Sequence, residues 1–179
     1  MITKKILKLK ILSKIRGYVH PLLLVEKGMK LGKNSDFGDN CMVDQTFCWL
    51  IEIGDNVTIS NNVSFIAHDA SLQYVIGYTK LGRIIIEDNC FIGARSIILP
   101  NVKIGKGSIV GAGSLVNKNI PAGEVWAGNP ARKIMDVTEY KNKYSNMNLK
   151  KFDATYLYDK SKHKYIINET SKKGITLIE

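Results

Sequence analysis

Three histidines are the side chains of this sequence best suited to acid–base chemistry near neutral pH. They are His20, His68 and His163, and only His68 lies in the regular middle of the chain. Two acids, Asp44 and Asp69, fall where they could orient the His68 ring or bind a substrate. A neutral imidazole there could serve as a general base, although an aspartate at a chain corner is also an ordinary turn residue.

The elements that must position His68 follow a six-residue repeat. The second and fourth positions of each hexad are rich in Gly, Asn and Asp, and the fifth is small or β-branched. This pattern predicts short flat strands that point an aliphatic side chain inward, joined by sharp corners that Gly or Asn can adopt. Three strands and three corners would make one coil, and stacked coils would share one core. Consecutive hexads begin at Ile86, Ile92, Ile98, Ile104, Val110 and Val116.

Two interruptions break the repeat. Val43 and Ile53 are farther apart than one hexad, and the step from Phe65 to Ile86 is longer still. Long loops inserted in compact repeats are usually functional. Because His68 lies where the second insertion, residues 69–83, leaves the coil, we expect the chemistry of the protein at this point.

The net charge of +10 is concentrated in the two ends of the chain. It is +8 over residues 1–33, −1 over residues 34–134 and +3 over residues 135–179. A nucleic-acid-binding protein usually carries its basic stripe on the folded body, so we expect no nucleic-acid partner. Residues 1–30 are typical of a basic amphipathic helix and a linker, which would cap the first coil, pack on a neighbouring subunit or contact a membrane surface peripherally. Residues 135–179 lose the repeat and form a basic, Tyr-rich extension.

The cysteine and hydropathy patterns narrow the class of protein. Three cysteines without a C-x-x-C spacing indicate buried thiols rather than a disulfide framework or a zinc ribbon. A metal enzyme of the γ-carbonic-anhydrase kind needs three histidines per metal ion, whereas the repeats supply only His68, so we expect no metal. No apolar run approaches the roughly 20 residues that span a bilayer, and no signal peptide is apparent, so we expect a cytoplasmic protein.

Beyond these patterns, the sequence resembles a known family. The hexads, the His68 position, Gly111-Ala-Gly-Ser, Ile120-Pro and Gly128-Asn-Pro-Ala-Arg together resemble the hexapeptide-repeat acetyltransferases, especially the galactoside, maltose, nodulation-factor and capsule types. The resemblance covers about residues 31–135. It implies a mainly β fold, with a left-handed parallel β-helix over residues 31–134 between the N-terminal helix and the C-terminal extension. It also implies a homotrimer with active sites between subunits and acetyl-CoA as co-substrate.

The resemblance assigns roles to individual residues. His68 matches the general base, Asp44 falls near an acid that binds the acceptor, and Asp69 is a further catalytic candidate beside the histidine. Ala94 matches a residue whose backbone N–H lies near the thioester oxygen. Where galactoside-type members carry Trp and Pro, this chain has Phe91 and Asp69, so its acceptor should differ from simple galactosides. The positions that match coenzyme A contacts are Ala94, Ala112, Asn117, Lys118 and Arg132.

The expected function is therefore acetyl-CoA-dependent O-acetylation of a sugar or glycan hydroxyl, as in capsule or cell-surface polysaccharide synthesis. No Cys or Ser shows a nucleophile signature, so we expect direct transfer without an acyl-enzyme. Two alternatives stay open. One is N-acetyl or other acyl transfer to an amino-sugar, and the other is a non-catalytic binding or scaffold protein on the same fold.

Overall fold

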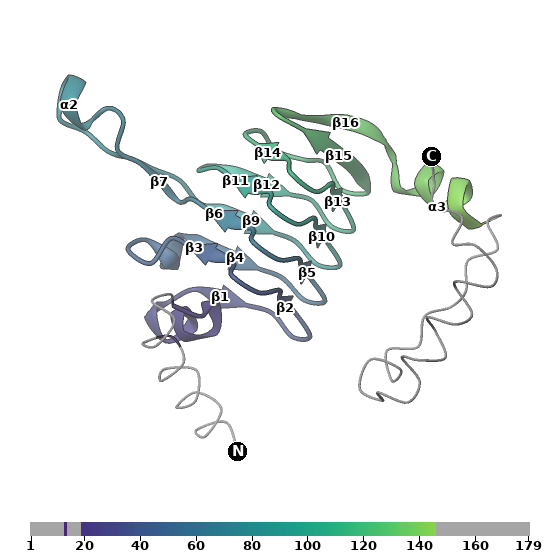
Figure 1. Ribbon diagram of the computed structural model, residues 1–179, viewed down its shortest axis with the longest axis horizontal. Helices are drawn as coiled ribbons and strands as arrows, with labels where there is room; N and C mark the ends of the chain where they lie inside the picture. The colour runs from purple at the N-terminus through teal and green to yellow at the C-terminus, as the bar shows by residue number, and fades with distance from the viewer. Residues whose placement is uncertain (1–12, 14–18, 146–179) are drawn as a thin grey trace, which may run out of the picture. The chain divides into compact units, whose positions relative to one another are not determined.

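The computed structural model describes residue 13 and residues 19–145 of the chain. The predicted N-terminal helix falls almost entirely outside these residues, as does the extension beyond residue 145. The described part is mainly β, and its parallel sheets stack around one core (Figure 1). The predicted fold class is confirmed to that extent, whereas the left hand of the winding stays a prediction.

Three sheets form the walls of the coil, which we call the first, second and third wall in chain order. Each coil adds one short strand to each wall, in parallel with the strand below. The first wall contains β1 (Lys30–Leu31), β4 (Ile51–Ile53), β9 (Ile84–Ile86) and β12 (Val102–Ile104). The second contains β2 (Asp36–Phe37), β5 (Thr58–Ile59), β10 (Phe91–Ile92), β13 (Ile109–Val110) and β15 (Glu124–Gly128). The third contains β3 (Met42–Val43), β6 (Ser64–Phe65), β11 (Ile97–Ile98) and β14 (Leu115–Val116).

The remaining elements stand outside this repeat. A 3-10 helix, η1 (Pro21–Lys27), precedes the first coil, and a second, η2 (Cys48–Leu50), occupies the first interruption. The second interruption forms an arm in which β7 (His68–Asp69) pairs antiparallel with β8 (Lys80–Leu81), with α2 (Gln73–Ile76) at its far end (Figure 1). After the last coil, β15 turns back into β16 (Ala131–Asp136), which α3 (Val137–Ser145) follows.

Strand pairing shows that the two interruptions loop out without shifting the stack. On the second wall, Phe37 pairs with Ile59, Ile59 with Ile92, and Ile92 with Val110. The step from Ile92 to Val110 is three hexads, which is the uninterrupted coil. The other two steps are longer by just the lengths that the two interruptions add. Both loops therefore leave and rejoin the coil at the same edge, between the third and first walls.

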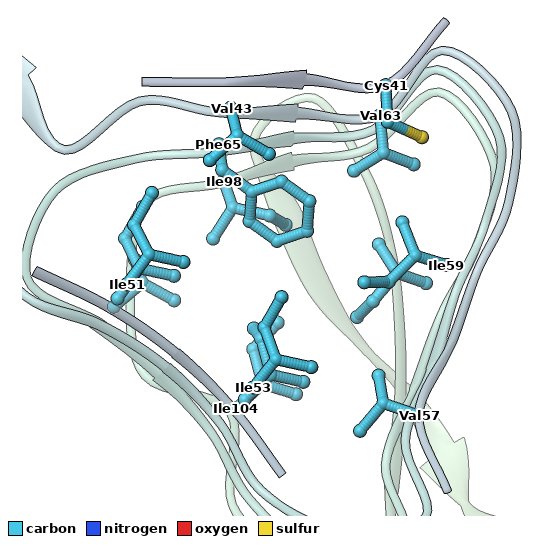
Figure 2. Packing of buried hydrophobic residues seen from close by; sticks show 14 of the residues in the cluster. Cys41, Val43, Ile51, Ile53, Val57, Ile59, Val63, Phe65, Ile98 and Ile104 are labelled. Carbon is cyan, nitrogen blue, oxygen red and sulfur yellow. The ribbon is translucent and has the colours of Figure 1, made fainter. Parts of the chain in front are cut away.

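The core is a set of aliphatic columns that run through the stack. Figure 2 shows the side chains of the three walls pointing into one interior, with residues of successive coils lying over one another. Ile53, Ile86 and Ile104 on the first wall are at most 2% exposed. Burial of such a side chain stabilises the fold by roughly 1.5–3 kcal/mol, which is why the first hexad position is aliphatic.

The corners use the fourth hexad position for left-handed backbone. Asn89, Arg95 and Asn101 have φ near +60°, and Gly107 and Gly113 continue the series at +71° and +69°. Asparagine tolerates this conformation better than most residues and glycine does so without steric cost. The predicted role of Gly and Asn at the corners is thus confirmed.

Glycine at the second hexad position has a different reason. A Cβ built on Gly93 would lie 2.4 Å from the backbone nitrogen of Ala112, and one on Gly105 would lie 2.4 Å from that of Ala122. The next coil approaches too closely for any side chain. The second position therefore sets how tightly the coils can stack.

The fifth position places small polar side chains under the corners. The hydroxyls of Ser96 and Ser108 donate to backbone carbonyls of the next coil, at 3.1 and 2.7 Å. Cys41 and Cys90 occupy the same position and direct their thiols to carbonyls in the same way. All three cysteines, including Cys48, are buried and unpaired by disulfides, as expected from their number and spacing.

Within the described residues, none of the helices combines the length and the hydropathy needed to traverse a lipid bilayer.

Two glycines of one corner give a matched test of these roles. Gly105→Ala should destabilise the protein by about 3 kcal/mol or more, because its Cβ meets backbone that cannot move aside. Gly107→Ala should cost only about 1 kcal/mol of backbone strain, since no atom lies within 4 Å of its Cβ. Urea unfolding at one fixed protein concentration measures both. Equal losses for the two variants would contradict the packing role of the second position.

Candidate active site

The predicted site residues lie on two different edges of the coil. Asp44, His68, Asn117 and Lys118 follow third-wall strands and stand on the third–first edge. Within that edge, Asp44 and His68 belong to adjacent coils, because Val43 pairs with Phe65. Asn117 and Lys118 lie two coils beyond His68 along the axis, which is about 10 Å at the usual strand spacing.

The structure joins His68 to Asp44. Nδ1 of His68 contacts Oδ2 of Asp44, whose side chain is 4% exposed, while the imidazole is 38% exposed. The same carboxylate accepts three backbone N–H groups, from Thr46 and Phe47 at 3.1 Å and from Ala67 at 3.2 Å. The acid is thereby fixed in place, and it fixes the ring that faces solvent.

This contact also fixes the tautomer of the imidazole. A carboxylate that already accepts three N–H groups acts only as an acceptor, so Nδ1 of His68 carries the hydrogen toward it. Nε2 then keeps its lone pair and is the atom able to take a proton. A buried acid and an oriented, partly exposed imidazole form the geometry of a general base.

Asp69 is held within the arm rather than against the imidazole. Its Oδ1 accepts the Ser71 N–H at 2.9 Å, and its Oδ2 lies 3.6 Å from Nζ of Lys80. The hydrogen bond from Ser71 holds the pKa of this carboxyl below its usual value, with Lys80 adding to the effect. The sequence leaves open whether Asp44 or Asp69 orients the imidazole. In the structure, Asp44 is the acid that contacts it.

The remaining candidates stand on the second–third edge. Ala94 and Ala112 occupy equivalent corners of successive coils, since Gly113 N–H donates to the Ala94 carbonyl at 2.8 Å. The turn into β16 lies over the same edge, because Gly128 N–H reaches Ser114 Oγ at 3.3 Å, and this places Arg132 beside it. Within one chain, the third-wall strands separate these residues from His68.

The two cations predicted to contact coenzyme A, Lys118 and Arg132, differ from the first-wall cations in their ion pairing. Lys30, Arg83 and Lys103 on or beside that wall pair with glutamates at 2.7–3.2 Å. In contrast, Lys118 and Arg132 form no ion pair with any residue that the structure describes. Exposed cations without an acidic partner suit a phosphorylated ligand.

The sequence patterns single out neither Phe47, whose ring packs beside the imidazole of His68, nor Trp49, which packs on Phe47. The Phe47 ring lies 5.2 Å from the imidazole and 5.5 Å from the indole of Trp49, measured between ring centroids. Both belong to the first interruption, which breaks the hexad pattern and so carries no period to read. The sequence marks them only as two aromatic residues in a segment that is longer than the repeat needs.

The described part of the chain also includes candidate metal ligands and buried thiols. No group of three or more His, Cys, Asp and Glu side chains there is arranged to hold a metal ion. Burial raises the pKa of the Cys41 and Cys90 thiols, which disfavours the nucleophilic thiolate.

Known families and proteins share this repeat. A family model described as "Bacterial transferase hexapeptide (six repeats)" matches residues 83–118, and another, "Hexapeptide repeat of succinyl-transferase", matches residues 28–65. "Putative acetyltransferase YvoF" of Bacillus subtilis (strain 168) is 39% identical over 115 residues, which are 64% of each chain. The 2,3,4,5-tetrahydropyridine-2,6-dicarboxylate N-acetyltransferase of Staphylococcus aureus (strain JH9) is 44% identical over 73 residues, 41% of this chain and 30% of that protein. The chain therefore spans less than two thirds of these relatives.

Solved structures agree with the relatives. The hexapeptide-repeat acetyltransferase VCA0836 of Vibrio cholerae O1 biovar eltor, complexed with acetyl coenzyme A, is 31% identical with a TM-score of 0.57, covering 62% of this chain and 61% of that one. A maltose O-acetyltransferase from Clostridium difficile 630 is 28% identical with a TM-score of 0.51, covering 63% and 72%. The family models match the hexapeptide repeats, and these relatives and structures show that the chain is similar to hexapeptide-repeat acetyltransferases. These two relatives and two structures are acetyltransferases by name.

The anchoring of Asp44 can be tested without an activity assay. Asp44→Ala should lower the free energy of unfolding by about 3 kcal/mol, because it leaves three backbone N–H groups and the imidazole without their acceptor. Asp44→Asn keeps one acceptor oxygen, so its free energy of unfolding should fall by less. Asp69→Ala, on the exposed arm, is the control and should unfold like the wild type in urea. A loss for Asp69→Ala as large as that for Asp44→Ala would contradict the assignment.

Proposed function

We propose that this protein is an acetyl-CoA-dependent O-acetyltransferase that acts on a hydroxyl of a sugar or glycan. The observation that carries the proposal is the Asp44–His68 pair on an open edge of a hexapeptide coil. The left-handed winding, the homotrimer and a cytoplasmic role in capsule or cell-surface polysaccharide synthesis belong to the same proposal.

The transfer needs one base and one oxyanion donor. Nε2 of His68 takes the hydroxyl proton as the acceptor oxygen attacks the thioester carbon. The backbone N–H of Ala94 stabilises the developing oxyanion, an interaction worth roughly 3 kcal/mol in typical enzymes. The carbon–sulfur bond then breaks, and the imidazolium returns its proton to the coenzyme A thiolate. Asp44 stabilises that imidazolium without itself taking the proton.

Acetyl-CoA, the acetyl donor, binds along the coil axis. Its anionic phosphates meet Lys118 and Arg132, and Ala112 and Asn117 line the path of the pantetheine arm. The Vibrio cholerae neighbour, described with acetyl coenzyme A, supports this co-substrate. The Clostridium difficile maltose enzyme supports a sugar hydroxyl as acceptor.

The split between two edges supports a site shared by two subunits. His68 belongs to the third–first edge, whereas Ala94, Ala112 and Arg132 belong to the second–third edge. A cleft in which one edge of a protomer faces the other edge of its neighbour would unite them. A cyclic trimer makes three such heterologous contacts and closes.

N-acetyl transfer is the second candidate. The Staphylococcus aureus relative, an N-acetyltransferase, favours it. An amine that arrives as an ammonium ion must also lose a proton, so the same base serves. Thiol release measured with matched hydroxyl and amine acceptors separates the two reactions.

His68→Ala should lower turnover by about 10²-fold or more, because it removes the imidazole that takes the hydroxyl proton in the proposed reaction. Thiol release from acetyl-CoA measures turnover, calorimetry measures coenzyme A binding, and light scattering measures the oligomer. Coenzyme A binding and the oligomeric state should stay at their wild-type values. Near-normal turnover would overturn the role of His68, and the absence of coenzyme A binding in the wild type would favour a scaffold protein.

Mixed oligomers test the shared site. Ala112→Trp should block the donor groove at an exposed corner, so this variant and His68→Ala should each be inactive alone. Co-expressed chains should regain activity, because about one third of the sites in each mixed trimer pair an intact His68 with an intact Ala112. A site built within one chain would leave every mixture inactive.

A further inference from the structure

The surroundings of the proposed base include an aromatic side chain that the reaction does not use. Trp49 is 56% exposed, although its neighbour Cys48 is 1% exposed. Its ring makes an edge-to-face type of contact with Phe47, at 64° between the ring planes. Phe47 in turn packs against the core and against His68. The two centroid distances are 5.5 and 5.2 Å, so the Phe47 ring bridges the indole and the imidazole.

The indole stands on a rigid support. Trp49 is the middle residue of η2, whose Leu50 N–H donates to the Phe47 carbonyl at 2.9 Å. The Cys48 thiol points to carbonyls of η1, and Gly28 leaves room for the base of Trp49, since a Cβ there would lie 3.2 Å from the Trp49 Cβ. An exposed aromatic side chain that is held at its base and by a neighbouring ring is preorganised for a ligand.

The charges beside His68 are already neutralised. The Asp44 carboxylate is occupied by three backbone N–H groups and the imidazole, and the Asp69 carboxylate faces Lys80. The surface around the base thus presents aromatic faces and an imidazole rather than an unpaired charge. An acceptor for this surface is uncharged, has a face of C–H groups to lay on the indole, and carries a hydroxyl for the imidazole.

We infer that Trp49 is the stacking platform for a neutral pyranose ring and so selects sugar hydroxyls as acceptors. This inference rests on the proposed function and deepens it. One face of the ring lies on the indole, and the ring or its neighbour in the glycan places a hydroxyl at Nε2 of His68. Trp49 determines specificity, and its contribution is to acceptor binding rather than to the chemical step.

Kinetics give the first test. Trp49→Ala should raise the acceptor KM about tenfold, the value of one aromatic stacking contact, with kcat and the acetyl-CoA KM within about twofold of wild type. The acceptor KM of Trp49→Phe should lie between the values for the wild type and for Trp49→Ala. Ile134→Ala removes an equally exposed apolar side chain, 55% against 56%, at the other end of the coil, and should match the wild type. The acceptors are methyl glycosides of glucose, galactose and N-acetylglucosamine, and maltose.

Fluorescence tests binding without turnover. The chain has two tryptophans, so Trp126→Phe leaves Trp49 as the single reporter. The same sugars, added without acetyl-CoA, should shift its emission and protect it from acrylamide. Sugar acetylation that is unchanged by Trp49→Ala would overturn the platform and leave the proposed function standing. Sugars that neither react nor shift the emission would overturn both. A dissociated oligomer in Trp49→Ala would overturn the platform in favour of a subunit contact.

Discussion

Close contact between the backbones of successive coils is the constraint on which this structure depends. At the second hexad position the next coil passes so near that Gly93 and Gly105 have no space for a Cβ. At the fourth position the chain must turn through left-handed backbone, as at Asn89 and Gly107. These two requirements recur along the stack, so they hold the aliphatic columns in register. The packing of the core therefore depends on the geometry of the corners as well as on the burial of its apolar side chains.

This rigidity explains where the chain can carry a function. An extra residue within a wall would break the register of every later coil, so additions must loop out at a corner. Both interruptions leave from the third–first edge, on adjacent coils. The first contributes Asp44, Phe47 and Trp49, and the second begins at His68. The Asp44 N–H donates to the Phe65 carbonyl at 3.0 Å, in the same pattern that stacks the walls. The acid and the imidazole therefore meet because the coils beneath them are stacked.

The sequence predicts the parts of this arrangement that obey a period. The inward Ile and Val residues, the Asn and Gly corners and the two loops can all be read from spacing, and His68 is marked by its place at a loop. The pairing of His68 cannot be read in this way. Asp44 is distant in the chain, and although coil stacking brings it beside His68, its carboxylate is oriented by the N–H groups of the aperiodic first interruption. The adjacent Asp69 instead lies against Lys80 in the antiparallel arm. The aromatic pair Phe47 and Trp49 falls in the same aperiodic loop.

Rigid edges have a consequence for the proposed chemistry. Within one chain, the hydrogen-bonded walls set the separation between His68 on one edge and Ala94 on the other. A base and an oxyanion donor act together only when both reach the same carbonyl within hydrogen-bond distance. In the proposed site, association with a neighbouring protomer sets that distance. Assembly would then determine the geometry of the reaction, while each coil determines the orientation of its own group.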